Sequence, residues 1–198
     1  ADHKKGIVHQ AVEISNKSKE SKYLEIVTEV LDQNGKLVLR SASKDQVKEN
    51  TVKEIRLKDL ILTNPQLWSV ASPSLYRIKM QLKIGRKIVD EIETPYGIRS
   101  VRWSKGLKPS GDPRLLVNGE AVFINGIAEY EHKLGQSHAF EREEIDARIR
   151  QIRTLGFNSF RDAHQPHNLR YQQAWDQHGI LLWTQLAAHI WFDTPAFR

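Results

Sequence analysis

Residues 155–183 read LGFNSFRDAHQPHNLRYQQAWDQHGILLW, and this stretch decides the fold of the second half of the chain. It combines an apolar strand, a helix that begins near Asn168 and ends at Gly179, and a second apolar strand. The preceding stretch FEREEIDARIRQIRTLG, residues 140–156, also ends in glycine and repeats isoleucine at helical spacing: Ile145, Ile149 and Ile152. Strands and helices that alternate with short connections predict a series of parallel βαβ units.

Four polar side chains follow the first of these strands: Arg161, Asp162, His164 and His167. A buried strand has no use for such groups, so we predict a loop that carries chemistry. A metal site is disfavoured here, because Pro166 prevents a helix from placing His164 and His167 on one face. Two simpler interpretations stay open: Arg161 as a structural partner of a buried carboxylate, and His164 as an ordinary loop histidine.

The first half of the chain follows a different period. Residues 23–41, YLEIVTEVLDQNGKLVLRS, alternate apolar and polar residues on both sides of an Asn-Gly turn, which predicts a hairpin. Further strands are expected at residues 8–14, 52–57, 75–84 and 87–94. Six or seven short strands within about 100 residues are typical of an antiparallel, immunoglobulin-like β-sandwich. Trp68 is expected in the core of this sandwich or at a domain junction.

The net charge of +6 raises the possibility of nucleic-acid binding, which the charge pattern disfavours. The excess of Lys and Arg lies in residues 1–103, where basic and apolar residues alternate as on a solvated strand face, without a basic cluster interleaved with aromatics. No apolar run approaches the 18 residues of a membrane span. The lack of Cys excludes disulfides, thiolate catalysis and Cys-ligated zinc. The start, without Met or a signal-peptide core, suggests a piece of a longer protein.

Four motifs, in this order along the chain, carry a family resemblance. They are NPQLWSVASPSLYRIKMQL (64–82), YGIRSV (96–101), LLVNGEAVFINGIAEYEH (115–132) and the stretch at 155–183. Together they resemble glycoside hydrolase family 2, which contains β-galactosidases, β-glucuronidases and β-mannosidases. The resemblance implies an all-β immunoglobulin-like sandwich over residues 1–103, a linker at 104–114, and the start of a truncated (β/α)8 TIM barrel over 115–198. The barrel part would hold a hairpin and then a strand–helix–strand–helix–strand series.

In such a barrel the active site lies at the carboxyl ends of the strands. The resemblance implies a pocket for the terminal sugar, in which His164 hydrogen-bonds a ring hydroxyl and Arg161 orients neighbouring carboxylates. Glu129 or Glu131 could instead pair with an arginine, and Trp183 is expected in the barrel core. The substrate-binding residues expected are Arg161, Asp162, His164, Tyr130 and Glu131.

Several positions near the expected sugar pocket depart from the family pattern, most of them with a loss of charge. Where the family often has His-Glu-His after the first barrel strand, Tyr130 replaces the first histidine. Gln165 stands where a Tyr usually precedes Pro166, and the third strand ends in Thr184-Gln185 where Asp-Glu is common. These departures leave the sugar specificity open, whereas they affect the fold less.

The family resemblance also implies where the catalytic carboxylates lie. Glycoside hydrolysis requires two carboxyl groups, and in the family these are the Glu of an Asn-Glu pair after strand four and a Glu after strand seven. This chain has no Asn-Glu pair and should end after strand three. We therefore expect both groups to lie beyond residue 198 and the fragment alone to be inactive.

The sequence thus favours a fragment of a retaining exo-β-glycosidase that acts on terminal β-linked sugars, with β-galactosidase as the favoured activity. Its expected partners are the carbohydrate substrate and the remainder of its own barrel, with no nucleic acid, membrane, metal or cofactor. A periplasmic or secreted location is favoured over a cytoplasmic one. The alternative is a non-catalytic immunoglobulin-like module for carbohydrate binding or adhesion, which would have no need for the βα units after residue 115.

Overall fold

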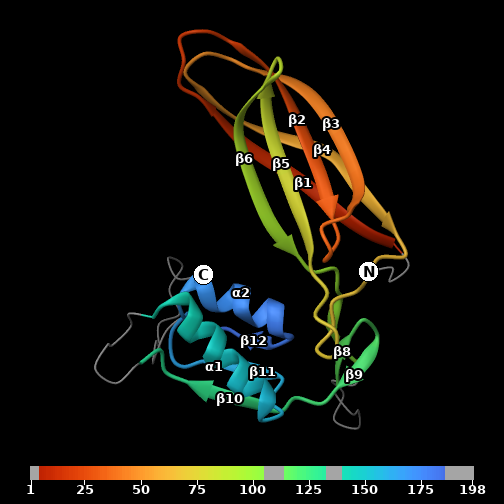
Figure 1. The fold of residues 1–198 in the computed structure, drawn as a ribbon, viewed down its shortest axis with the longest axis vertical. Helices are drawn as coiled ribbons and strands as arrows, with labels where there is room; N and C mark the ends of the chain where they lie inside the picture. The colour runs from red at the N-terminus through yellow and green to blue at the C-terminus, as the bar shows by residue number, and fades with distance from the viewer. Residues whose placement is uncertain (1–4, 105–113, 133–139, 186–198) are drawn as a thin grey trace. The chain divides into compact units, whose positions relative to one another are not determined.

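A computed structural model describes residues 5–104, 114–132 and 140–185 (Figure 1). Its contacts divide the chain into two units, each described by itself below. The first unit is Ala1–Trp68 with Ser74–Ser100, and the second is Ser69–Pro73 with Val101–Arg198. The predicted linker at 104–114 lies, except for its two end residues, outside the described part of the chain.

The first unit is a sandwich of two antiparallel sheets (Figure 1), as the period-two pattern predicts. One sheet pairs β1 (Lys5–Asn16) with β4 (Thr51–Thr63). The other sheet has the strand order β3-β2-β5-β6. Its strands are β2 (Lys22–Leu31), β3 (Leu37–Val47), β5 (Tyr76–Ile84) and β6 (Lys87–Tyr96).

The core of the sandwich lies between the two sheets. The alternating residues predicted for one face of β2 are all buried, namely Leu24, Ile26, Thr28 and Val30. Because β2 is hydrogen-bonded on both sides, to β3 and to β5, it is a central strand whose apolar face must be covered. The residues that cover it from β1 and β4 include Val8, Ile14, Ile55, Leu60 and Leu62.

Two local features of the sandwich follow from the sequence. The hairpin between β2 and β3 turns where predicted, and the Asp32 carboxylate accepts the backbone N–H groups of Asn34 and Lys36, both at 2.9 Å. Trp68 is fully buried, and the Arg99 guanidinium lies 4.0 Å from the centre of its ring. The predicted burial of Trp68 is therefore confirmed.

The second unit begins with a small antiparallel sheet of β7 (Val101–Trp103), β8 (Leu115–Val117) and β9 (Glu120–Val122). A two-residue turn joins β8 to β9, with φ of 55° at Asn118 and 88° at Gly119. Asn and Gly tolerate positive φ better than other residues, which is why this pair closes a tight hairpin. The predicted hairpin is confirmed.

Three parallel strands and two helices form the rest of the second unit (Figure 1). In chain order they are β10 (Gly126–Glu129), α1 (Arg142–Thr154), β11 (Ser159–Asp162), α2 (Leu169–His178) and β12 (Leu181–Trp183). Both pairings, β10 with β11 and β11 with β12, are parallel. The predicted βαβ series is thus confirmed.

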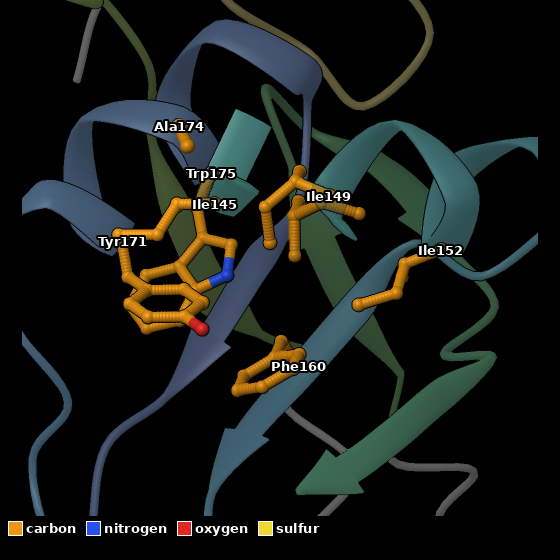
Figure 2. Packing of buried hydrophobic residues seen from close by; sticks show 8 residues of the cluster. Ile145, Ile149, Ile152, Phe160, Tyr171, Ala174 and Trp175 are labelled. Atoms are coloured by element: carbon orange, nitrogen blue, oxygen red, sulfur yellow. The ribbon is translucent and has the colours of Figure 1, made fainter. Parts of the chain in front are cut away.

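One apolar cluster holds the helices against this sheet. Figure 2 shows Phe160, on β11, facing the isoleucines of α1 and the aromatic residues of α2. The rings of Tyr171 and Trp175 lie side by side, with centroids 5.5 Å apart. Ile145, Ile149 and Ile152 are buried at the helical spacing seen in the sequence.

Gly179 ends α2 in a left-handed conformation, with φ of 72°. A Cβ at this position would lie 2.5 Å from the carbonyl oxygen of Val70. The same carbonyl accepts a hydrogen bond from Arg153 Nη2 at 3.0 Å. Glycine is needed here both for its φ and for the close approach of the segment Ser69–Pro73.

Trp183, which the sequence places in the core of a complete barrel, is 69% exposed in the described part of the chain, so its place in that core stays a prediction. It lies at the end of β12, which is an edge strand of the three-stranded sheet, so no further strand covers it among the described residues. Within the same described residues, neither helix is long and apolar enough to cross a membrane.

Candidate sugar-binding site

The polar residues singled out in the sequence lie at the carboxyl ends of β10, β11 and β12. Parallel pairing aligns Glu129 with Asp162 and Arg161 with Trp183, so the segments that follow the strands leave the sheet at the same edge. Tyr130 follows β10, His164 follows β11 and Gln185 follows β12. This edge is where the active sites of (β/α)8 barrels lie.

Gln185 connects Arg161 and His164. Its Oε1 lies 2.9 Å from Arg161 Nη2 and 3.0 Å from His164 Nδ1. Because a guanidinium can only donate hydrogen bonds, the Gln185 atom that faces it must be the carbonyl oxygen. That oxygen can only accept, so His164 must carry a proton on Nδ1 in this arrangement.

Tyr130 completes this outer cluster. Its ring meets the His164 ring edge to face, with centroids 5.0 Å apart and planes at 81°. Tyr130 is exposed and His164 is partly buried. The structure therefore brings together three of the five predicted site residues, Arg161, His164 and Tyr130, in a cluster open to solvent.

Asp162 and Glu131, the other two predicted site residues, are buried and hold the backbone of the loop. The Glu131 side chain accepts the backbone N–H of Asn168 at 2.9 Å. Asn168 in turn caps α2 by accepting the N–H of Arg170 at 3.0 Å. Asp162 accepts the backbone N–H of His167. These two carboxylates thus bind the consecutive N–H groups of His167 and Asn168, where the loop from His164 enters α2.

The side chain of His167 is buried beneath the same loop. Its ring packs against Phe160, Tyr171 and Trp175, with centroid distances of 5.5, 5.2 and 6.4 Å. His167 Nδ1 lies 3.8 Å from Asp162 Oδ1. Burial raises the pKa of the Asp162 carboxyl, His167 opposes this rise, and the charge of Glu131 adds to it.

Two further side chains near β10 have structural partners. Glu129 pairs with the guanidinium of Arg148 on α1, which is the simpler interpretation that the sequence left open for one of the two glutamates. Burial raises the pKa of Tyr171 to about 12, and the charges of Glu131 and Glu129 contribute to this rise. Tyr171 is therefore a neutral core residue at physiological pH.

The sequence did not identify Gln185 and His167 as parts of this arrangement. In the sequence, Gln185 is noticeable only as a lost charge, although its position at the end of the third strand is itself a signal for a site residue. His167 stands out there only as a possible metal ligand together with His164. The described residues contain no group of three or more His, Cys, Asp or Glu side chains able to hold a metal ion.

A β-sandwich followed by parallel βα units, with polar side chains at the carboxyl ends of the strands, is the arrangement of a multidomain enzyme whose TIM barrel follows a β-sandwich domain. The model of "Glycosyl hydrolases family 2" matches residues 1–99, and that of the "Glycosyl hydrolases family 2, TIM barrel domain" matches residues 111–189. This chain belongs to glycosyl hydrolase family 2.

Relatives and solved structures agree with this assignment. A protein named putative beta-glucuronidase from Formosa agariphila is 26% identical over 91% of this chain and 16% of its own length. A beta-galactosidase from Psychromonas ingrahamii is 31% identical over 61% of this chain and 11% of its own. A family 2 beta-glucuronidase structure superposes with a TM-score of 0.88 at 22% identity, covering 98% of this chain and 20% of that one. A family 2 structure from Bacteroides cellulosilyticus superposes with a TM-score of 0.82 at 24% identity, covering 93% of this chain and 24% of that one.

The similarity to the solved structures establishes the fold: an immunoglobulin-like sandwich followed by the first strands and helices of a TIM barrel, as the sequence predicts. The chain spans between 11% and 18% of the length of the curated relatives it matches.

Proposed function

We propose that this chain is part of a retaining exo-β-glycosidase and that it supplies one wall of the pocket for the terminal sugar. The observation that carries the proposal is the cluster of Arg161, His164 and Gln185 at the carboxyl ends of β11 and β12. A charged donor, an imidazole and an aromatic ring at a barrel mouth match the hydroxyl groups and apolar face of a sugar. In this proposal residues 1–103 form the sandwich, 104–114 the linker and 115–198 the barrel part.

Each side chain has a distinct role in this proposal. His164 hydrogen-bonds a ring hydroxyl, and Arg161 orients the carboxylates that the rest of the barrel brings to the pocket. Tyr130 packs beside His164 and limits the pocket on the side of β10. Glu131 and Asp162 hold the loop in place from below rather than contacting the sugar directly.

The catalytic acid/base and nucleophile lie outside this chain in the proposed enzyme. Glu129 is paired with Arg148, and Glu131 and Asp162 are buried, so none of the carboxylates around β10 and β11 is placed as one of two carboxyl groups flanking a glycosidic bond. A terminal β-galactoside is the first substrate to test, and a β-glucuronide the second, since the relatives carry both names.

The test compares the full-length enzyme with the isolated chain on aryl β-galactosides and β-glucuronides. The full-length enzyme should hydrolyse at least one of them, whereas the chain of 198 residues should show no hydrolysis above background. Turnover by the isolated chain that disappears in Glu131→Ala or Asp162→Ala would show that the chemistry is carried locally. A full-length protein that binds carbohydrate without hydrolysing it would favour the binding-module alternative.

A further inference from the structure

Asp162 and His167 form an acid–imidazole pair buried beneath the loop that carries His164. Their side chains are 3% and 1% exposed, and His167 Nδ1 lies 3.8 Å from Asp162 Oδ1. Asp162 Oδ1 and both ring nitrogens of His167 have no hydrogen-bond partner among the described residues. Buried polar atoms are rarely left unpaired, so an arrangement of three such atoms calls for an explanation.

The pair sits where it can act on the predicted sugar-binding loop. Asp162 ends β11 and His167 lies three residues after His164, so the two enclose the segment Ala163–Pro166. The backbone N–H of His167 already bonds to the Asp162 carboxylate. A second bond, between the two side chains, would close the base of the loop.

The charges around the pair favour a state with one added proton. Among the described residues, the titratable groups that face it are Glu131, whose side chain accepts the N–H of Asn168, and the neutral phenol of Tyr171. With neutral His167 and ionised Asp162, two negative charges lie buried near each other. A proton on the pair makes it neutral overall, which removes the repulsion with Glu131 and shortens the contact to a charge-assisted hydrogen bond.

We propose that Asp162 and His167 hold one proton between them and that this proton positions the loop carrying His164. His167 is in this proposal a positioning residue, because it acts on the site through the loop and does not touch the sugar. The proton transfers between His167 Nδ1 and Asp162 Oδ1 and is lost to solvent at high pH, with no other reactant required.

The direction of the pH dependence follows from the raised pKa of Asp162. A group whose pKa is higher in the folded protein stabilises the fold below its ordinary pKa, and this contribution is lost as the pH rises through the folded value. The loop should therefore be held most tightly at acidic pH and should loosen at higher pH, as the pair loses its proton. If His167 were only a packing residue, Asp162 would give this trend alone and His167→Gln would leave it unchanged, whereas a proton shared by the pair predicts that His167→Gln flattens it.

Hydrogen exchange of the chain, followed for the peptide covering residues 163–168, tests the proposal. Protection factors, corrected for the intrinsic pH dependence of exchange, are compared from about pH 3.5, below the ordinary pKa of Asp, to about pH 9 for the wild type, Asp162→Asn and His167→Gln. In the wild type, protection should fall by about tenfold or more across the range, the change equivalent to one pKa unit. In Asp162→Asn, which keeps the size and one acceptor oxygen, the trend should disappear.

The exposed pair of His9 and Asp59 provides the matched control. Its Nδ1–Oδ1 distance is 2.9 Å, but its side chains are 79% and 47% exposed. Asp59→Asn should leave the pH profile of the loop peptide unchanged. The peptide covering α1 reports whether each variant is folded, and the wild-type profile decides the question even if a variant does not fold. A flat wild-type profile, or the same slope in Asp162→Asn, would overturn the proposal.

The consequence for sugar binding rests on the proposed function, whereas the exchange measurement does not. In the full-length enzyme, Asp162→Asn should flatten the alkaline decline of kcat/KM that the loosened loop causes. If the exchange trend is present and the enzyme hydrolyses no glycoside, the proposed function fails and the proton-holding pair stands. If the enzyme is active and the exchange profile is flat, the pair fails and the proposed function stands.

Discussion

Gly179→Ala should destabilise the second unit much more than Gly156→Ala, although both glycines follow helices and have positive φ. The φ values are 72° at Gly179 and 85° at Gly156. Alanine in the left-handed region costs about 1–2 kcal/mol at either position. A Cβ at Gly179 would also lie 2.5 Å from the Val70 carbonyl oxygen, whereas nothing lies within 4 Å of a Cβ at Gly156.

The additional cost at Gly179 comes from the contacts of Val70. To admit a Cβ, the Val70 carbonyl must move, and its hydrogen bond from Arg153 Nη2 at 3.0 Å is then weakened or lost. A hydrogen bond to a charged group contributes about 1.5–3 kcal/mol. We therefore expect a loss of about 2.5–5 kcal/mol for Gly179→Ala, against about 1–2 kcal/mol for Gly156→Ala.

Urea unfolding followed by circular dichroism at 222 nm measures this difference, because both helices of the described structure belong to the second unit. Gly156→Ala is the matched control, because it measures only the cost of placing alanine in the left-handed backbone region. If the two variants lose the same stability within about 0.5 kcal/mol, the scatter expected for sites without special contacts, then the segment Ser69–Pro73 does not pack against the end of α2 as described.

Two other predictions concern the same unit. Ile149→Ala, at a fully buried position of α1, should lower the free energy of unfolding in urea by about 2–5 kcal/mol. The control Leu155→Ala, at a side chain that is 73% exposed, should change it by no more than about 0.5 kcal/mol. Equal losses in the two variants would refute the packing in Figure 2. Because the pKa of Tyr171 is raised to about 12, its contribution to stability is complete below pH 10 and lost as the pH rises towards 12. Tyr171→Phe should remove this alkaline loss, and an unchanged alkaline profile would contradict it.

Much of the fold was predictable because local patterns and tertiary packing agree. The isoleucines of α1 and the alternation along β2 each place apolar groups on the face that the structure buries. The Asn118-Gly119 turn was predictable from the two residue types alone, because both tolerate the positive φ that a tight turn requires. The exposure of Trp183 was not, because an apolar strand looks the same in sequence whether or not a neighbouring strand covers it.

The grouping of the candidate site residues was predictable in outline, whereas their individual contacts were not. The rule that active sites lie at the carboxyl ends of parallel strands predicts that Arg161, His164 and Tyr130 lie near one another, as they do in the structure, and their role in sugar binding stays a prediction. The bridge through Gln185 joins residues more than twenty positions apart, and no local pattern signals such a pairing. The burial of His167 depends on aromatic residues from β11 and α2 that surround its ring, which periodicity does not show.

The most direct test of the central claim is the effect of His164→Ala on the full-length enzyme. If His164 hydrogen-bonds the sugar, kcat/KM should fall by about ten- to a thousand-fold, or about 1.4–4 kcal/mol of transition-state binding. Much of the loss should appear in kcat, because hydrogen bonds to the sugar hydroxyls strengthen in the transition state. The melting temperature should change little, and His9→Ala, at an exposed site on β1, should leave the kinetics unchanged. An unchanged kcat/KM together with a lowered melting temperature would contradict the account and make His164 a structural residue of the loop.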